Sequence, residues 1–212
     1  MQSNNVKAIL LGYSGHGIVV SEAATLSGFQ ILGYTDRKEL NINPCNFDFL
    51  GDENDPNFNW EYCNSYLLGV GSNIIRERIA SRVEKAGGKC LTVVHPTSSL
   101  ASTVVIGEGT FVARNAAVNP LVRIGKNAIL NTNCTIDHEC IIGNNVHIAP
   151  GAVLAGNVVL NDGVFIGANA VVKQGVSIGR NATIGAGSVV LRNVEENQVV
   201  VGNPARILTR WK

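Results

Sequence analysis

Charge and aromatic side chains are both scarce in this chain of 212 residues. Charged residues make up 16% and aromatic residues 6%, and 17 basic residues are offset by 16 acidic ones, so the formal net charge is +1. Such a chain has no excess of basic residues with which to bind the phosphates of a nucleic acid. No apolar run approaches the ~20 residues of a membrane-spanning helix. We therefore expect no nucleic-acid partner and no membrane partner.

Cysteine motifs are missing as well. Five cysteines lie at positions 45, 63, 90, 134 and 140, no two of them form a Cys-x-x-Cys motif, and an odd number cannot all pair. The opening stretch MQSNNVKAILLGYSG has too short an apolar run for a signal peptide. We therefore expect free thiols and a reducing, cytoplasmic location.

Glycine, by contrast, is abundant at 23 residues, and the second half of the chain repeats every six residues. Sixteen consecutive positions in steps of six are aliphatic, and the position two before each, from Val104 on, is small or β-branched. Six residues make one short strand and one turn, so stacked coils bury two side chains from each hexapeptide in one core. The aliphatic positions are Leu100, Ile106, Val112, Val118, Ile124, Leu130, Ile136, Ile142, Ile148, Leu154, Leu160, Ile166, Val172, Ile178, Ile184 and Val190.

This pattern resembles the hexapeptide-repeat family, whose fold is a left-handed parallel β-helix. The resemblance implies about three hexapeptides in each coil, and therefore roughly five coils in this chain. It also implies a homotrimer with active sites between neighbouring subunits. Most members of the family are acyltransferases that use acetyl-CoA or an acyl carrier. Cys134 and Cys140 fall on inward positions of the repeat, so we expect them to be structural.

A polar cluster lies on outward positions of the repeat. Asp137, His138 and Glu139 are consecutive, His147 follows, and none of the four occupies an inward position, so we expect all of them outside the core of the helix. Histidine suits proton abstraction near neutral pH, and an adjacent carboxylate can orient the ring and stabilise its protonated form. The sequence leaves open which carboxylate pairs with His138. A solvated outer face or a contact between subunits is the alternative, and the spacing matches no metal motif, so we expect no metal.

The first 94 residues predict a small α/β domain. VKAILLGYSGHGIVVSEAATL predicts a strand, a loop with three glycines and a helix from about His16, and FQILGYTD predicts a second strand that ends at Asp36. Backbone N–H groups at the start of such a helix bind phosphate, and an acidic residue after the second strand contacts ribose or base. The order G-x-x-G-x-G differs from the G-x-G-x-x-G of dinucleotide enzymes. Residues 38–60 are polar and rich in turns, and could form a loop beside the ligand.

The fold class that we expect is thus an N-terminal Rossmann-like domain followed by a left-handed parallel β-helix of hexapeptide repeats. Residues 1–94 would bind a nucleotide sugar, and residues 95–212 would form the acyltransferase domain with a C-terminal closing segment.

GYSGHG, the His-Pro step, IDHECIIGNNVHIAPGAVLAGNV and the closing VVVGNPAR are together similar to one family. It is the sugar O-/N-acetyltransferase family, which includes the bacillosamine-pathway UDP-amino-sugar, perosamine and sialic acid acetyltransferases. The resemblance implies transfer of an acetyl group from acetyl-CoA to the amino group, at C4, of a nucleotide-linked amino-deoxysugar in glycan biosynthesis.

The resemblance also implies roles for individual residues. His138 corresponds to the general base and Glu139 to the residue that raises its basicity. The residues that correspond to acetyl-CoA contacts are His147, Gly156, Ala168 and Ala186, the last at a position where relatives commonly carry Gly. The residues that correspond to the substrate-binding set are Ser14, Gly15, His16, Asp36 and Arg37. Relatives often have a second Asp where this chain has Arg37, so the nucleotide base is open. In the closing segment, Arg206 would approach the CoA phosphates or be a solvated cation.

Three other functions are compatible with parts of the sequence. An O-acetyltransferase acting on sialic acid or a polysaccharide could use the same base. A non-catalytic trimer that senses a nucleotide sugar or serves as a scaffold would bind the ligand without cleaving a thioester. An oxidoreductase is the least favoured, since its glycine spacing is wrong and the repeat would have no role. The sugar, the ring position and the length of the acyl donor are not determined by the sequence.

Overall fold

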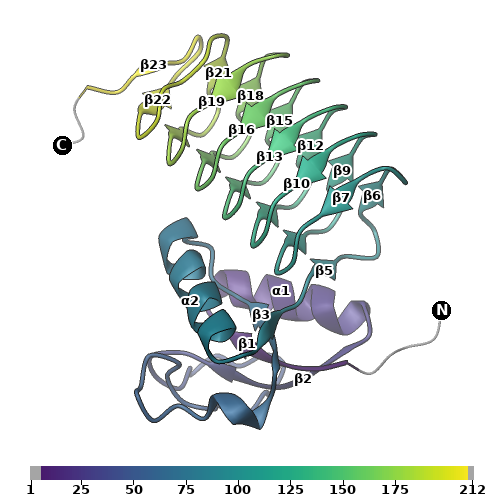
Figure 1. The fold of residues 1–212 in the computed structure, drawn as a ribbon, viewed down its shortest axis with the longest axis vertical. Helices are drawn as coiled ribbons and strands as arrows, with labels where there is room; N and C mark the ends of the chain where they lie inside the picture. Colours follow the sequence, from purple (N-terminus) through teal and green to yellow (C-terminus); the bar gives the residue numbers. More distant parts are fainter. Residues whose placement is uncertain (1–5, 210–212) are drawn as a thin grey trace.

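The computed structural model describes residues 6–209, which form an α/β unit followed by a long parallel β-helix (Figure 1). The α/β unit has one parallel sheet with strand order β2-β1-β3-β4. Its elements are β1 (Val6–Leu11), α1 (Gly15–Leu26), β2 (Phe29–Thr35), the 3-10 helix η1 (Trp60–Tyr62), β3 (Ser65–Leu68), α2 (Asn73–Lys85) and β4 (Lys89–Cys90). The Rossmann-like prediction for this part is confirmed, with α1 starting one residue before the expected position.

The turn between β1 and α1 is tight because it is built from glycine. A Cβ atom on Gly17 would strike the carbonyl oxygen of Gly12, and Gly12 itself has a positive φ of 86°. Only glycine combines this backbone shape with so close an approach of helix to strand. The start of α1 is therefore held directly at the carboxyl end of β1.

The β-helix, called the prism below, has three faces. Each coil takes 18 residues, because Arg123 pairs with Ile141 and Thr135 with Val153. The eight-stranded face consists of β5 (Val93–Val94), β8 (Phe111–Val112), β11 (Ile129–Leu130), β14 (His147–Ile148), β17 (Phe165–Ile166), β20 (Thr183–Ile184), β22 (Val199–Val201) and the antiparallel β23 (Arg206–Ile207). The six-stranded face consists of β6 (Ser99–Leu100), β9 (Ala117–Val118), β12 (Thr135–Ile136), β15 (Val153–Leu154), β18 (Val171–Val172) and β21 (Val189–Val190). The five-stranded face consists of β7 (Val105–Ile106), β10 (Arg123–Ile124), β13 (Ile141–Ile142), β16 (Val159–Leu160) and β19 (Ser177–Ile178).

The core of the prism is the aliphatic column that the repeat predicts. From Val112 to Val190 the aliphatic positions are buried, and the small residues two before them fill the remaining space. Each buried aliphatic side chain stabilises the fold by about 1.5–3 kcal/mol relative to an exposed one. Cys134 and Cys140 belong to this core, and burial raises the pKa of the Cys134 thiol to about 12. They are structural thiols, as expected.

The prism begins one hexapeptide earlier than Leu100. Val94 lies six residues before Leu100, and β5 pairs with β8 rather than joining the N-terminal sheet. The sequence GGKCLTVVHP, whose composition predicts one last strand of the α/β domain, is therefore divided between β4 and β5. With this extra strand and the closing segment, the left-handed β-helix has about six turns.

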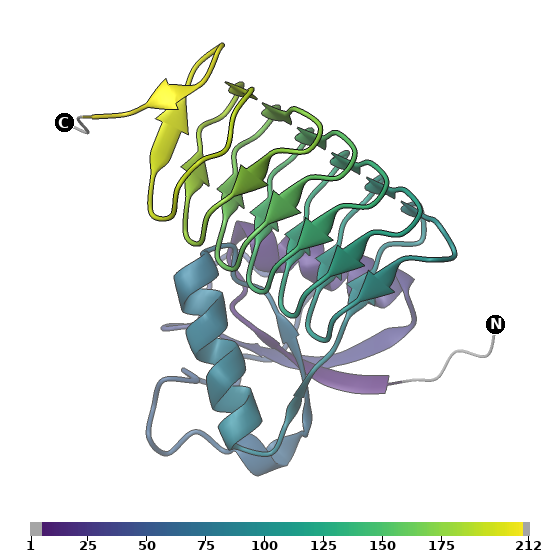
Figure 2. The ribbon, with the colours of Figure 1, turned by 45° about the horizontal axis from the view of Figure 1, so that its top comes forward.

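The α/β unit covers the eight-stranded face of the prism. Outward side chains of that face, Phe111 and Ile129 among them, share a buried cluster with Val20 and Ala23 of α1. Figures 1 and 2 show α1 between the N-terminal sheet and the first coils, while β22 and β23 lie at the far end of the prism. Within residues 6–209 no helix is long and apolar enough to cross a membrane.

Candidate active site

The turn that carries the candidate base has a strained backbone. In steps of six from residue 109 to residue 187, all fourteen turn positions have a positive φ, and all but two are Asn or Gly. Asn and Gly adopt this left-handed conformation more easily than other residues do. The two exceptions are Leu121, with φ 65°, and Glu139, with φ 60°. Backbone strain of this kind concentrates at functional sites, where the surrounding structure maintains it.

The strained turn places Glu139 against the imidazole of His138. Nδ1 of His138 lies 3.0 Å from Oε2 of Glu139, whereas Nε2 lies 3.9 Å from the nearer oxygen of Asp137. A carboxylate only accepts hydrogen bonds, so we assign the ring proton to Nδ1, which leaves the lone pair on Nε2 free. The ring is half-exposed, with 47% of its side-chain surface accessible. Glu139 is therefore the carboxylate that orients the ring.

Asp137 holds the turn rather than the ring. Its Oδ1 accepts hydrogen bonds from Nδ2 of Asn119, at 2.7 Å, and from the backbone N–H of His138, at 2.8 Å. These two donors, the Asn119 amide first, hold the pKa of the Asp137 carboxyl below its usual value. Asn119, on the preceding coil, thus helps to hold the negative charge of Asp137 in place near the His138 ring.

Gly156 forms the surface on which the His138 ring rests. A Cβ atom at Gly156 would lie 2.5 Å from Cε1 and 2.6 Å from Nε2 of His138, and no real Cβ contact is that short. Gly156 lies one coil after His138, at the same corner between the six-stranded and five-stranded faces. We call this the base corner, with residues 119–122, 137–140 and 155–158 on successive coils. Glycine at position 156 therefore determines where the ring can lie.

The loop before α1 forms a second candidate site. Ser14 is the N-cap of α1 and its side chain makes no capping hydrogen bond, so it leaves the first N–H groups of the helix available. A cavity of about 400 Å³ opens beside this loop, next to the polar segment that was expected there. It is lined by Tyr13, Ser14, Gly15, Ile18, Lys38, Glu39, Leu40, Asn41 and Ile42.

Asp36 lies at the end of β2, next to the same loop. Its Oδ2 accepts a hydrogen bond from the backbone N–H of Tyr13, at 3.2 Å, and its Oδ1 accepts one from the N–H of Arg37, at 2.8 Å. Asp36 thereby ties the loop to the second strand. The side chain of Arg37 is exposed.

His16 and His147 meet where the α/β unit contacts the prism. Their ring centroids are 6.2 Å apart, and His147 is only 8% exposed although it points out of the prism core. His147 donates from Nδ1 to the carbonyl of Gly71, at 3.1 Å, and its Nε2 accepts from Asn131, at 3.2 Å. Burial lowers the pKa of both histidines to about 4. Both rings are therefore neutral at neutral pH, and His147 is buried by the α/β unit rather than solvated.

Arg76 joins the two parts of the chain and was not singled out from the sequence. It is 1% exposed, and its guanidinium donates to the carbonyls of Asn127 and Asn145 in the prism and to that of Gly71 before α2. Burial lowers its pKa to about 10. The signal that could have revealed it is its spacing from Ile79 and Val83, since it occupies the first position of the apolar stripe of α2.

The structure divides the sequence-predicted residues into separate groups. His138, Glu139 and Gly156 meet at the base corner, whereas His16 and His147 meet at the eight-stranded face, which is the face opposite that corner. Ser14, Gly15 and Asp36 lie in or beside the loop that carries His16. Ala168 and Ala186 lie one above the other at the corner between the eight-stranded and six-stranded faces. Within one chain, the candidate base is therefore remote from the candidate phosphate loop.

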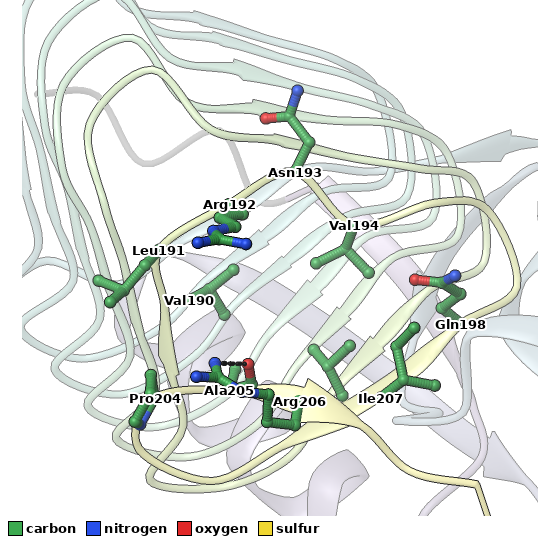
Figure 3. Close-up of a pocket in the computed structure, with 11 residues that line it drawn as sticks. Val190, Leu191, Arg192, Asn193, Val194, Gln198, Pro204, Ala205, Arg206 and Ile207 are labelled. Carbon is green, nitrogen blue, oxygen red and sulfur yellow. Dashed lines mark hydrogen bonds between the residues drawn. The ribbon is translucent and has the colours of Figure 1, made fainter.

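A further cavity, of about 560 Å³, lies at the far end of the prism. Figure 3 shows Arg192 and Arg206 among otherwise mostly apolar lining residues, with Arg206 bonded to the carbonyl of Ala205. Two cationic side chains therefore line this cavity. Among residues 6–209, no group of three or more His, Cys, Asp or Glu side chains is arranged to hold a metal ion.

Comparison with known proteins identifies both parts of the chain. Residues 7–83 match the PglD N-terminal domain, and residues 121–156 and 157–192 match the bacterial transferase hexapeptide model of six repeats. The UDP-N-acetylbacillosamine N-acetyltransferase of Bacillus subtilis (strain 168) is 34% identical over 47 residues, an alignment that spans 22% of each chain.

Solved structures match over nearly the whole chain. The acetyltransferase domain of PglB from Neisseria gonorrhoeae FA1090 is 32% identical, with a TM-score of 0.87 over 96% of this chain and 100% of that one. The same domain in complex with acetyl coenzyme A is 29% identical, with a TM-score of 0.89 over 97% of this chain and 100% of that one. PerB from Caulobacter crescentus, in complex with CoA and GDP-perosamine, is 28% identical, with a TM-score of 0.89 over 95% of this chain and 97% of that one.

A hexapeptide prism with a carboxylate-oriented histidine on an exposed corner defines the class of protein as an acyltransferase. Within that class, the chain belongs to the family of acetyl-CoA-dependent sugar N-acetyltransferases that combine this prism with a PglD-type N-terminal domain.

Proposed function

We propose that the protein transfers the acetyl group of acetyl-CoA to the amino group, at C4, of a nucleotide-linked amino-deoxysugar. The observation that carries the proposal is the His138–Glu139 pair, with Nδ1 bound to the carboxylate and Nε2 left free on a half-exposed ring. A general base needs this arrangement, in which one ring nitrogen is held and the other faces the proton that it removes.

In the chemical step, the role of this chain is to accept a proton from the amine and to return it to the leaving group. The amine nitrogen attacks the thioester carbonyl of acetyl-CoA, Nε2 of His138 takes the proton that the amine loses, and a new C–N bond forms. The C–S bond then breaks, and the imidazolium returns its proton to the departing thiolate of CoA. Glu139 stabilises the imidazolium while it exists, because an opposite charge within hydrogen-bond distance favours the charged form.

Residues 1–94 act, in this proposal, as the nucleotide-sugar-binding domain, and residues 95–212 as the acyltransferase domain. The uncapped N-terminus of α1 and the cavity beside Ser14 and Gly15 support binding of a diphosphate by free N–H groups. Asp36, at the end of β2 and beside this loop, would contact the ribose or the base. Asp36 also fixes the loop itself, and Arg37 beside it adds a positive charge close to the phosphates.

The active form is proposed to be a homotrimer with sites between subunits. The support is the separation of the candidate groups on one chain, since the base corner lies opposite the face that carries His16 and His147. A second subunit whose α/β unit faced the base corner of the first would bring the two groups together. Gly156, Ala168, Ala186 and His147 would then contact acetyl-CoA from two subunits, with the end cavity near Arg206 available for its phosphates. A cytoplasmic location is supported by the five free cysteines.

The alternative function, O-acetylation, is favoured by one observation, the exposure of the candidate base. A base on an exposed corner can activate a hydroxyl as well as an amine, so O-acetylation of sialic acid or a polysaccharide uses the same geometry. The uncapped helix N-terminus beside the cavity favours a substrate that carries phosphate, and so the nucleotide-linked amino sugar.

The test is release of the free CoA thiol from acetyl-CoA by the purified protein. The acceptors are UDP- and GDP-linked 4-amino-deoxysugars and free sialic acid, with His138→Ala assayed in parallel. We expect release with an amino-nucleotide sugar only, lowered about 10²- to 10⁴-fold in the variant. Release with sialic acid alone would move the function to O-acetylation. Near-wild-type turnover in His138→Ala would refute the role of the base, and substrate binding without any release would indicate a non-catalytic binder.

A further inference from the structure

The cavity of about 400 Å³ beside the start of α1 is lined by two separate segments. One is the first turn of α1 with the loop before it, and the other is residues 38–42, which follow β2. The second segment is anchored at its centre, because the backbone N–H of Leu40 donates to the hydroxyl of Tyr34, at 3.0 Å. Leu40 and Ile18 also pack against the same buried cluster. The cavity therefore has a fixed apolar floor.

The position of this cavity relates it to one part of a nucleotide. In a parallel α/β sheet a nucleotide lies at the carboxyl ends of the strands, with its phosphates at the start of the first helix and its ribose near the acidic residue after the second strand. Here those two positions are the N–H groups after Ser14 and the carboxylate of Asp36. The chain runs directly from Asp36 into residues 38–42. The base, which follows the ribose, therefore meets this second segment.

The second segment offers both apolar and polar groups to a base. Ile42 is 76% exposed and presents apolar surface at the cavity, together with the anchored Leu40. Lys38, Glu39 and Asn41 present polar groups at the same cavity. Lys38 and Glu39 are adjacent and opposite in charge, yet neither forms an ion pair within residues 6–209. An ammonium group and a carboxylate are thus both available to a ligand.

This pair of groups distinguishes between the bases. A carboxylate only accepts hydrogen bonds, and an ammonium group only donates them. Guanine is the one common base whose pairing edge has two adjacent donors, N1–H and the N2 amino group, followed by an acceptor, O6. Uracil has a single donor between two carbonyl oxygens, so a carboxylate facing it would meet an oxygen. The amide of Asn41 can serve either base, whereas the charged pair fits guanine.

We propose that Glu39 is a specificity-determining residue that selects a guanine nucleotide, by accepting hydrogen bonds from N1–H and from the N2 amino group of the base. Lys38 donates to O6. The inference rests on the proposed function and names the nucleotide that carries the amino sugar, which the sequence leaves open.

The test is calorimetric titration of the purified full chain with GDP, UDP and inosine diphosphate, which differs from GDP only in lacking the N2 amino group. Glu39→Gln keeps the size of the side chain but replaces one acceptor by a donor. Glu61→Gln removes the same charge from an exposed position of the α/β unit outside the cavity, so it serves as the matched control. Thiol release with one amino sugar linked to GDP or to UDP is measured on the same preparations.

The wild type and Glu61→Gln should bind GDP about tenfold more tightly than inosine diphosphate, and UDP more weakly than GDP. In Glu39→Gln the GDP affinity should fall about tenfold, to that of inosine diphosphate. Charge alone predicts the reverse, because loss of a carboxylate lessens the repulsion of every diphosphate.

Equal binding of GDP and inosine diphosphate by the wild type would overturn the inference, as would tighter binding of UDP. An unchanged GDP preference in Glu39→Gln would do the same. Selective GDP binding without thiol release from any acceptor would refute the proposed acetyl transfer but leave the choice of guanine standing. Absence of binding by all three diphosphates would refute both the nucleotide site and this inference.

Discussion

Glu139→Asn should make the protein more stable and less active at the same time. Glu139 adopts a left-handed backbone conformation, and Asn occupies the corresponding position in seven of the other turns between residues 109 and 187. Relief of this strain should stabilise the folded state by about 1 kcal/mol. For a chain of this length the gain corresponds to a rise of about 2–4 °C in Tm. The hydrogen bond to Nδ1 of His138 is lost in the same variant, so turnover should fall about tenfold to a hundredfold.

Two control variants separate the two effects. Glu139→Gln keeps a long side chain in the strained turn but loses the negative charge, so turnover should fall without a rise in Tm. Asn115→Glu introduces a glutamate into a left-handed turn away from the base corner, so Tm should fall by a similar amount with turnover unchanged.

The assays are thermal denaturation followed by circular dichroism, and release of CoA thiol at saturating substrates. A fall in Tm for Glu139→Asn would refute the strain argument, because it would mean that the glutamate stabilises its own turn. Unchanged turnover in both Glu139 variants would refute the role of Glu139 in orienting the base. The two results are independent, so either half of the reasoning can fail alone.

Two further predictions follow from the geometry of the rings. Gly156→Ala should lower kcat at least about tenfold with little change in Tm, because the new Cβ atom displaces the His138 ring. Kinetic constants and Tm measured on one preparation test this prediction, and an unchanged kcat would contradict it. The fold should lose stability as the pH falls from about 6.5 to about 4, because His16 and His147 have folded pKa values of about 4, below their unfolded value of 6.5, and the unfolded chain therefore takes up protons first. The lowered pKa of each histidine corresponds to about 3 kcal/mol of unfolding free energy, which is fully present above pH 6.5 and is lost as the pH falls to about 4. The urea midpoint of the wild type should therefore fall across this range relative to that of a His16→Gln, His147→Gln double variant. Parallel pH dependence in the two proteins would show that other groups control acid stability.

Much of the fold follows from the sequence because the prism is periodic. Every inward position is fixed by a local rule, an aliphatic residue every six positions with a small residue two before it, and no long-range information is needed to place it. The repeat counted from the sequence starts at Leu100, whereas the prism already includes Val94, one hexapeptide earlier. Val94 follows the same rule, but the stretch around it also has the composition of a last strand of the α/β sheet. Only the pairing of β5 with β8 distinguishes the two.

The candidate site was less predictable, since it depends on contacts between the two parts of the chain. The outward direction of His147 follows from its phase in the repeat, whereas its burial follows from the docking of the α/β unit, which no local pattern records. Arg76 is a similar case. A charged residue in the apolar stripe of a helix is informative, but the carbonyls that it binds come from two coils of the prism.

In a periodic fold, the residue at one turn can be compared with the residues at all the equivalent turns. The fourteen turns share one backbone conformation, so the choice of Asn or Gly at twelve of them measures what stability alone selects. A departure from that choice lowers stability without improving the packing of the prism, and must therefore be explained by something outside the repeat. Both departures occur at one corner, on adjacent coils, beside the only described histidine ring that is half-exposed and bound to a carboxylate. The strain thus points to the same corner as the candidate base, by a criterion that does not depend on resemblance to other proteins.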